Sequence, residues 1–287
     1  MVKLIILDID GVLVGNKQGF NFPYPNKKVI SALQKIHKKG IPIILCSARF
    51  HSAVTPLVKK IGLRNPHITD SGALITDLAT GKIIRCFTME KNVVSEIIAI
   101  CLKNNIYIEC CTEKDYFIQK DQINSRITGQ RTLFLQKSPI VVNSLLEDIN
   151  NNIIKLLPIA KDEADKQRVD VLLKLTDDKV KTVWSKNYFT LPLQYRIITA
   201  KSASKVNAVS ETTKSLKIQL KDTLAVGDTM GDWEFIEPCG YVATMENAPA
   251  KLKEKVKTKG KGKYLIAPSV DDNGLLHILD YFLKGKI

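Results

Sequence analysis

Two aspartates, Asp8 and Asp10, lie two residues apart directly after the apolar run Lys3–Leu7. Because successive side chains of a strand point to opposite faces, a spacing of two predicts that both carboxylates lie on the same side. Two ionised carboxylates at such a short distance repel each other. A shared Mg²⁺ ion, which prefers oxygen ligands, would stabilise them. Gly11 follows and allows a sharp turn. The pair therefore predicts metal chemistry, the alternative being a loop whose aspartates only cap turns.

A second acidic cluster, Asp228 and Asp232, follows another apolar run, Thr223–Val226. Ligands of open α/β sheets bind at the carboxyl ends of the strands, so we expect this cluster at the same edge as the first pair. Four carboxylates at one edge need a cation, and we predict Mg²⁺. Asp232 can also cap a helix N-terminus, and the two roles are compatible.

Ser47 and a lysine are further candidate site residues. Ser47 ends the apolar run Ile41–Cys46 and can offer its hydroxyl and neighbouring backbone N–H groups to an anion, although a serine before a helix is often only a cap. Lys205 opens a predicted helix, where the helix dipole slightly disfavours a positive charge, which indicates another role. On local grounds Lys201 is an equal candidate.

The elements that position these residues alternate between strands and helices. Helical spacing of apolar residues predicts a helix over Lys27–Lys39, closed by Gly40. Further predicted elements are the strand Ile41–Cys46, the helix Ser52–Ile61, the strand His67–Thr69, the helix Ser204–Leu216 and the strand Thr223–Val226. Strand, helix, strand in this order predicts a Rossmann-like, doubly wound parallel sheet of the α/β class.

The middle of the chain has an alternation of its own. The predicted elements are strand Lys82–Phe87, helix Lys91–Asn104, strands Ile106–Cys110, Tyr116–Gln119 and Arg131–Leu135, helix Val141–Asn150, strand Ile154–Ile159, helix Asp162–Leu175 and strand Val180–Ser185. Because the first alternation resumes only afterwards, we expect an α+β domain over residues 81–191, inserted into a core of residues 1–80 and 192–287.

The composition is that of a globular protein with a basic excess. The 287 residues include 43 Lys and Arg against 29 Asp and Glu, a formal net charge of +14. Apolar runs are far shorter than the ~18–20 residues that span a bilayer, and the six cysteines include no CxxC pair. We expect a cytoplasmic protein with no membrane partner. The lysine-rich run Lys251–Lys263 lacks interleaved aromatic residues, so we interpret it as a solvated surface and expect no nucleic-acid partner.

Four segments carry a resemblance to a known family. In chain order they are Asp8–Leu13 (DIDGVL), Ser47, Lys205 and Gly227–Asp232 (GDTMGD). They resemble the four motifs of the haloacid dehalogenase-like (HAD) phosphatase superfamily, and their spacing resembles its Cof-type (type IIB) branch, which carries an α/β cap between the second and third motifs. Leu193–Ile198 followed by Ser204 and Lys205 resembles the return to the core in that branch, which selects Lys205 over Lys201. Thr244–Ala248 (TMENA) resembles its Met-Gly-Asn-Ala segment.

The resemblance implies a two-step phosphoryl transfer. Asp8 would attack phosphorus and form an aspartyl-phosphate, while Asp10 would protonate the leaving alcohol and then activate the hydrolytic water. Mg²⁺ would be held by the Asp8 carboxylate, the Asp10 main-chain carbonyl and Asp228, with Asp232 either a direct ligand or one shell further out.

The resemblance also implies the groups that would stabilise the transferring phosphoryl group. Lys205 and Ser47, with nearby N–H donors at Gly11, would neutralise its equatorial charge. Arg49 and Asn247 would contact the phosphate or support the residues that contact it. Arg49 could equally form an ion pair at the surface.

The implied activity is Mg²⁺-dependent hydrolysis of small phosphomonoesters, sugar phosphates or related metabolites. The inserted cap would select the leaving group, and its candidate contacts are Tyr116, Lys120, Arg126 and Arg131. The alternatives are a phosphomutase and a non-catalytic protein that binds a phosphate ligand or associates with nucleic acid; a pure binder has no need of Asp10. We expect a monomer or a homodimer.

Overall fold

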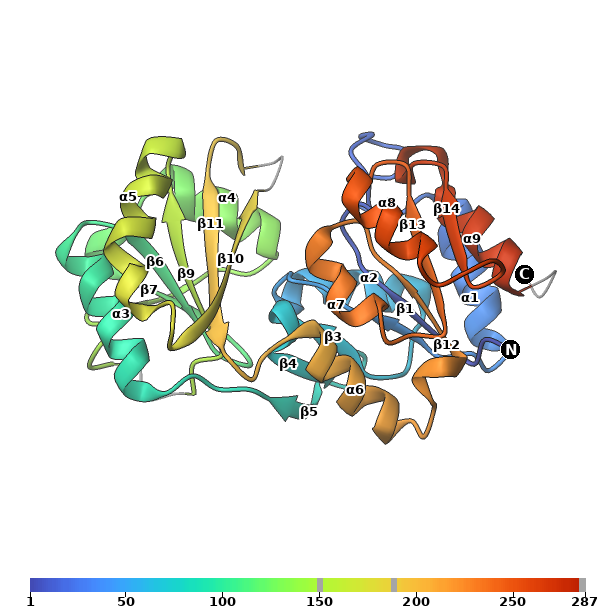
Figure 1. The fold of residues 1–287 in the computed structure, drawn as a ribbon. Helices are drawn as coiled ribbons and strands as arrows, with labels where there is room; N and C mark the ends of the chain where they lie inside the picture. The colour runs from blue at the N-terminus through green and yellow to red at the C-terminus, as the bar shows by residue number, and fades with distance from the viewer. Residues whose placement is uncertain (149–151, 187–189, 284–287) are drawn as a thin grey trace. The chain divides into compact units, whose positions relative to one another are not determined.

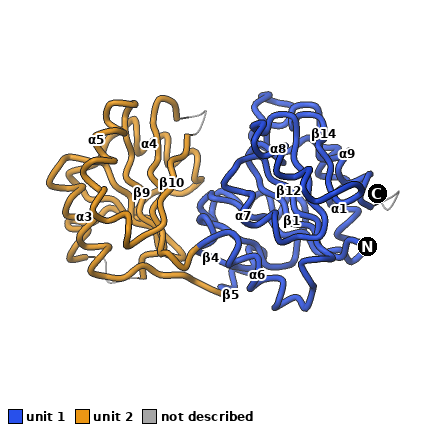
Figure 2. Tube along the Cα trace, in the orientation of Figure 1, with its two compact units in different colours: residues 1–84, 204–287 blue, residues 85–203 orange. Residues whose placement is uncertain are grey.

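The computed structural model describes residues 1–148, 152–186 and 190–283 (Figure 1). The chain forms two compact units, and the first is built from both ends of the sequence (Figure 2). Unit 1 comprises residues 1–84 and 204–287, and unit 2 comprises residues 85–203.

The sheet of unit 1 is parallel, with the strand order β14-β13-β12-β1-β2. Its strands are β1 (Leu4–Leu7), β2 (Ile43–Leu45), β12 (Thr223–Val226), β13 (Tyr241–Met245) and β14 (Tyr264–Ala267). β1 pairs with β2 on one side and with β12, from the far end of the chain, on the other. The segments that follow β1, β2 and β12 therefore meet at one edge, and the predicted doubly wound α/β core is confirmed.

Helices pack on this sheet, whose strands are mostly apolar. All four residues of β1 are buried, as expected for a parallel strand covered on both faces. The helices of unit 1 are α1 (Lys27–Lys38), α2 (His51–Ile61), α6 (Lys205–Ser215), α7 (Trp233–Ile236), α8 (Ala250–Lys257) and α9 (Gly274–Leu283). Buried residues of α1, α2 and α9 share one core with Ile5 and Leu7. Each such aliphatic side chain contributes about 1.5–3 kcal/mol on burial, which stabilises the sheet that carries the candidate site.

A buried histidine lies beside this core. A three-stranded sheet comprises β3 (His67–Thr69), β4 (Leu74–Asp77) and β5 (Lys82–Cys86). His67 is fully buried, and its Nδ1 accepts a hydrogen bond from the Leu45 amide (3.1 Å). No partner for its Nε2 lies among the described residues. Burial lowers the pKa of His67 to about 3, so the ring is neutral in the folded protein.

His67 should make the protein acid-sensitive. An unfolded histidine titrates near pH 6.5, so the unfolded state binds more protons between about pH 6.5 and 3, and stability falls as the pH drops through this window. From pH 7 to pH 5 the loss from this residue should be about 2 kcal/mol. His67→Asn keeps an acceptor for the Leu45 amide. In this variant the free energy of unfolding should fall less between pH 7 and pH 5 than in the wild type, because the contribution of His67 is removed. His277→Asn, at an exposed position, should keep the wild-type pH dependence; a wild-type slope in His67→Asn would contradict the assignment.

Unit 2 is a six-stranded sheet with its own core. The strand order is β10-β11-β9-β6-β7-β8. Its elements are α3 (Lys91–Lys103), β6 (Tyr107–Cys111), β7 (Tyr116–Gln119), α4 (Ser125–Leu135), β8 (Ile140–Val142), β9 (Lys155–Ala160), α5 (Glu163–Leu173), β10 (Val180–Lys186) and β11 (Gln194–Ala200). Buried residues of α3 and α5 pack with those of β6, β9 and β11. The predicted second domain of mixed helices and strands is therefore present.

Two predicted elements of unit 2 are wrong. The predicted strand Arg131–Leu135 is the end of helix α4, whose buried residues Ile127, Arg131 and Leu135 recur every four positions. The predicted helix over Val141–Asn150 begins instead as strand β8, which pairs with β7, and its last two residues lie outside the described part of the chain. Local β propensity misled the first prediction, and strand pairing decided the second.

The return to unit 1 also differs from the expected position. The sequence predicts that the core resumes at residue 192, whereas Gln194–Ala200 forms β11, which pairs with β9 and β10 in unit 2. Unit 1 resumes at Ser204. Across the described residues, no helix combines the length and the apolar character needed to cross a membrane.

Candidate active site

Three carboxylates and one ammonium group meet at the carboxyl edge of the unit 1 sheet. Asp8 follows β1, Asp228 follows β12, and Asp232 lies one turn further on. One carboxylate oxygen of each lies within 4.8 Å of the others. Lys205 Nζ donates to Asp8 Oδ1 and to Asp232 Oδ1, each at 2.6 Å. The structure thus brings together Asp8, Asp228, Asp232 and Lys205.

Helix α6 delivers the lysine. Its N-cap is Ser204, whose Oγ accepts from the Asn207 amide (3.1 Å), and Lys205 is its first residue. Burial opposes the positive charge of Lys205, but Asp8 and Asp232 outweigh it and raise the pKa of the ammonium group well above its usual range. Lys205 is therefore charged, whereas Lys201 lies exposed in a turn of unit 2.

Asp232 fixes the loop that carries Asp228. Its Oδ2 accepts from the Thr229 amide (3.0 Å), the Thr229 hydroxyl (2.7 Å) and the Asp228 amide (3.3 Å). Thr229 and Asp232 form a capping box at the start of the helical turn. Burial opposes its charge, but Lys205 and the Thr229 donors hold the pKa of Asp232 below its usual range. Both oxygens of Asp232 thus already have donors.

Asp228 is the least satisfied of the three carboxylates. Its Oδ1 is buried, and no hydrogen-bond partner for it lies in the described part of the chain. Burial and the nearby Asp232 raise the pKa of Asp228 to about 7. Gly11, at φ +77°, leaves room for this carboxylate, because a Cβ there would lie 1.8 Å from Asp228 Oδ2. The glycine is required both by its backbone conformation and by this close approach.

The cluster fits a divalent cation. Burial, together with Asp232 and Asp228, raises the pKa of Asp8 well above its usual range even though Lys205 opposes the shift. Three ionised carboxylates and the Lys205 ammonium would leave these four groups with net negative charge. The buried Asp228 oxygen that has no partner among the described residues, and the all-oxygen donor set, match the preferences of Mg²⁺.

The side chain of Asp10 lies apart from the three clustered oxygens. Its carboxylate accepts from Arg49 Nε (2.9 Å) and Arg49 Nη2 (2.5 Å), a bidentate ion pair. The Asp10 side chain is 58% exposed and that of Arg49 12%. The expectation that four carboxylates converge is therefore wrong for the Asp10 side chain, because the Arg49 guanidinium binds this carboxylate away from the other three.

A strained turn braces the two predicted phosphate contacts, Ser47 and Lys205. Ser47 is buried at the end of β2, and its Oγ accepts from the Arg49 amide (3.1 Å). Its carbonyl accepts from the amide of Ser71, which adopts φ +61° between Asp70 at +55° and Gly72 at +92°. A Cβ on Gly72 would lie 2.3 Å from the carbonyl carbon of Ser204. Such strain is typical of functional sites.

Gly72→Ala should destabilise the protein more than its backbone conformation alone explains. The alanine would collide with the peptide between Ser204 and Lys205 and displace the start of α6. The matched control is Gly62→Ala, which has a similar φ of +79° but no atom of a described residue within 4 Å of its added Cβ. Chemical denaturation should show a loss of about 1 kcal/mol for the control and about 1–3 kcal/mol more for Gly72→Ala. Equal losses would argue against the brace.

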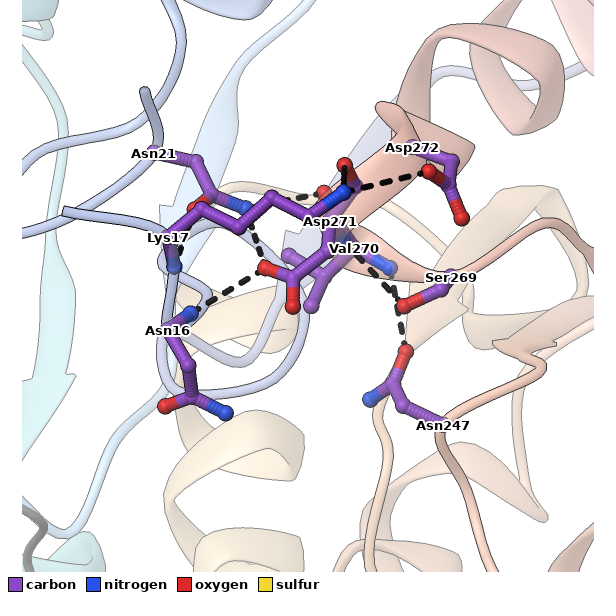
Figure 3. A network of polar contacts seen from close by, with 8 residues as sticks. All are labelled: Asn16, Lys17, Asn21, Asn247, Ser269, Val270, Asp271 and Asp272. Carbon is purple, nitrogen blue, oxygen red and sulfur yellow. Dashed lines mark hydrogen bonds and ion pairs between the residues drawn. The ribbon is translucent and has the colours of Figure 1, made fainter. Parts of the chain in front are cut away.

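Asn247 connects Asp228 to the loop after β1. It follows β13, and its Nδ2 donates to the Gly11 carbonyl (3.0 Å) and lies 3.4 Å from Asp228 Oδ2. Its Oδ1 accepts from the Val270 amide (3.1 Å) (Figure 3). Asn247 therefore links Asp228 to the turn at Gly11 and to Val270.

The cap candidates divide into two pairs. Arg131 is buried in unit 2 and forms a bidentate ion pair with the fully buried Glu109, with contacts of 2.7–3.1 Å. Tyr116 is also buried and donates to the Lys137 carbonyl (2.9 Å). Both are engaged inside the unit, whereas Lys120 and Arg126 are exposed.

Comparison with known proteins places this geometry in a family. The model of the haloacid dehalogenase-like hydrolases matches residues 5–279. The chain is 25% identical over 307 aligned positions to 5-amino-6-(5-phospho-D-ribitylamino)uracil phosphatase YwtE of Bacillus subtilis, covering 99% of both proteins.

Solved structures agree in fold. A haloacid dehalogenase-like hydrolase from Bacteroides thetaiotaomicron superposes with a TM-score of 0.82 at 18% identity, covering 98% of this chain and 99% of that one. A HAD subclass IIB sugar phosphatase gives a TM-score of 0.75 at 21% identity over the full length of both chains. The resemblance predicted from the order of the four motifs is confirmed. The chain belongs to the haloacid dehalogenase-like hydrolases and is an enzyme of their phosphatase type.

Proposed function

We propose that the protein is a Mg²⁺-dependent phosphatase that hydrolyses small phosphomonoesters, sugar phosphates or related metabolites, through an aspartyl-phosphate on Asp8. The observation that carries the proposal is the contact of 2.6 Å between Lys205 Nζ and Asp8 Oδ1 at the centre of the carboxylate cluster. A carboxylate held beside a permanent cation is a nucleophile ready to meet an anionic substrate.

Asp8 attacks phosphorus, and the bond from phosphorus to the leaving alcohol breaks as the bond to Asp8 forms. Lys205, already charged, neutralises the oxygens of the transferring group, and the Ser47 hydroxyl and the amides beside Gly11 add donors. Asp232 holds Lys205 at this position through its own contact of 2.6 Å. Water then cleaves the aspartyl-phosphate and regenerates Asp8.

Mg²⁺ would be held by the Asp8 carboxylate, the Asp10 main-chain carbonyl and Asp228, and it would supply positive charge to the phosphoryl oxygens. Asp232 would act one shell further out, because its two oxygens already accept four hydrogen bonds. Asn247 would help to position Asp228 through its side-chain amide.

Asp10 acts first in its protonated form, as the carboxylic acid that gives its proton to the leaving alcohol, and then as the carboxylate that takes a proton from the attacking water. Its side chain is largely exposed and pairs with the Arg49 guanidinium. Arg49 thus orients Asp10, and the phosphate dianion competes for the same guanidinium.

The substrate class rests on kinship. One relative of similar length is named for a phosphorylated ribityl compound, and one structural neighbour is a sugar phosphatase. Lys120 and Arg126, exposed on unit 2, are the residues proposed to contact the leaving group.

The test is hydrolysis of p-nitrophenyl phosphate, followed by a panel of sugar phosphates and other phosphorylated metabolites. Exhaustive chelation should abolish turnover and added Mg²⁺ should restore it, while Ca²⁺, with its larger and looser shell, should not. Full activity after chelation would refute the metal requirement, and inactivity on the whole panel would refute the proposed function.

A further inference from the structure

A polar network joins the loop after β1 to the loop after β14 (Figure 3), and Asn247 connects it to Asp228 of the candidate active site. Its centre is Asp271, in a helical turn over Val270–Asp272. Asp271 Oδ1 accepts from Asn21 Nδ2 (2.8 Å) and from the Asn16 amide (3.1 Å). The proposed mechanism uses none of these residues.

Asn21 is the buried partner of Asp271. It is 1% exposed, its Nδ2 also donates to the Val270 carbonyl (3.1 Å), and its Oδ1 accepts from the Lys17 amide (3.1 Å). Gly15 completes the packing, because a Cβ there would lie 2.1 Å from Asp271 Oδ1. The loop from Gly15 to Asn21 is thus folded around the Asp271 carboxylate.

Hydrogen bonds connect this loop in a closed ring with the turn at Gly11. Gly11 donates through its amide to the Val14 carbonyl (2.8 Å), and the next residue, Gly15, donates to the Asn21 carbonyl (3.1 Å). Asn21 then contacts the Val270 carbonyl, and the Val270 amide donates to Asn247. Asn247 returns to the Gly11 carbonyl and lies beside Asp228.

We propose that Asp271 is a positioning residue of the active site, which holds the Gly11 turn and the Asp228 carboxylate in the geometry that binds the cation. It acts through Asn21 and Asn247 and touches neither substrate nor metal. The inference rests on the proposed function. Groups behind a metal site typically change metal affinity or activity by roughly 10–100-fold when they are lost.

The test compares three substitutions in the same turn. Asp271→Ala removes the acceptor, Asp271→Asn keeps an Oδ1 in its place, and Asp272→Ala is the matched control. Asp272 is the next carboxylate along, with a side chain 63% exposed and a contact of 3.4 Å to Lys17. Calorimetric Mg²⁺ affinity, amide hydrogen exchange over residues 11–21, and kcat and KM for p-nitrophenyl phosphate are measured for each.

Asp271→Ala should weaken Mg²⁺ binding about tenfold, lower kcat about tenfold with KM changed less than about threefold, and speed exchange of the loop amides. Asp271→Asn should stay within about threefold of the wild type and Asp272→Ala within about twofold. Should Asp271→Ala fail to fold, Asn21→Ser, which loses the donor, carries the same expectation.

Equal behaviour of Asp271→Ala and Asp272→Ala, or of Asn21→Ser and the wild type, would overturn the inference. A wild type that binds Mg²⁺ but hydrolyses no ester would refute the proposed function instead, because Mg²⁺ affinity and amide exchange still report on Asp271 in that case.

Discussion

Asp8→Asn should lower turnover of every phosphate ester by roughly 10³-fold or more, with the fold intact. The amide keeps the shape of the carboxylate but cannot attack phosphorus. Lys205 loses one partner and keeps Asp232, so the variant does not leave an unpaired buried cation. Steady-state kinetics with p-nitrophenyl phosphate measure the loss of turnover, and circular dichroism shows whether the fold is intact.

Trapping the intermediate separates a nucleophile from a merely structural aspartate. Wild-type enzyme quenched with acid during turnover should carry one phosphate on the peptide that contains Asp8, and Asp8→Asn should carry none. Asp121→Asn, at an exposed position in unit 2, should be labelled and active like the wild type. Near wild-type turnover in Asp8→Asn would refute its assignment as the nucleophile.

The sequence predicted the meeting of Asp8 and Asp228 because both follow buried strands. In a parallel sheet the carboxyl ends lie at one edge, and β1 and β12 are neighbours in register from Leu4 opposite Thr223 to Leu7 opposite Val226. Strand periodicity and topology were sufficient for this prediction, without any side-chain detail.

The sequence could not decide which groups pair across that edge. Lys201 and Lys205 are equivalent on local grounds, and only the family resemblance selects Lys205. In the structure, the cap at Ser204 and the contacts to Asp8 and Asp232 distinguish the two lysines. The bidentate contact of Arg49 with Asp10 joins two loops, and no local pattern encodes it. The periodicity of apolar residues therefore could not predict side-chain pairs between distant segments.

One missed contact did have a local pattern. Thr229 and Asp232 have the three-residue spacing of a capping box. In this motif the side chain of each residue accepts a hydrogen bond from the backbone amide of the other. The pattern would have indicated that the Asp232 carboxylate accepts hydrogen bonds from its own loop. Asp271 and Asn21 have no such pattern, since 250 positions separate them and their contact depends on the turn at Gly15.

Asp228→Asn should abolish most activity and yet stabilise the metal-free protein. The pKa of Asp228 is about 7 in the fold against about 4 when unfolded, so between these values the folded state binds more protons. The stability of the metal-free wild type therefore falls as the pH rises from about 4 to about 7. The amide has no such proton to lose, and at about pH 8 the variant should be more stable by about 1–3 kcal/mol.

Mg²⁺ should reverse the order. A ligand that binds only the folded state stabilises it, so Mg²⁺ should raise the melting temperature of the wild type and raise that of Asp228→Asn much less. Thermal denaturation with chelator and with Mg²⁺, across the same pH range, measures both effects, and Asp280→Asn on α9 is the exposed control. If the chelated variant melts below the chelated wild type at about pH 8, the buried repulsion at Asp228 is refuted. If Mg²⁺ stabilises both proteins equally, Asp228 does not hold the cation.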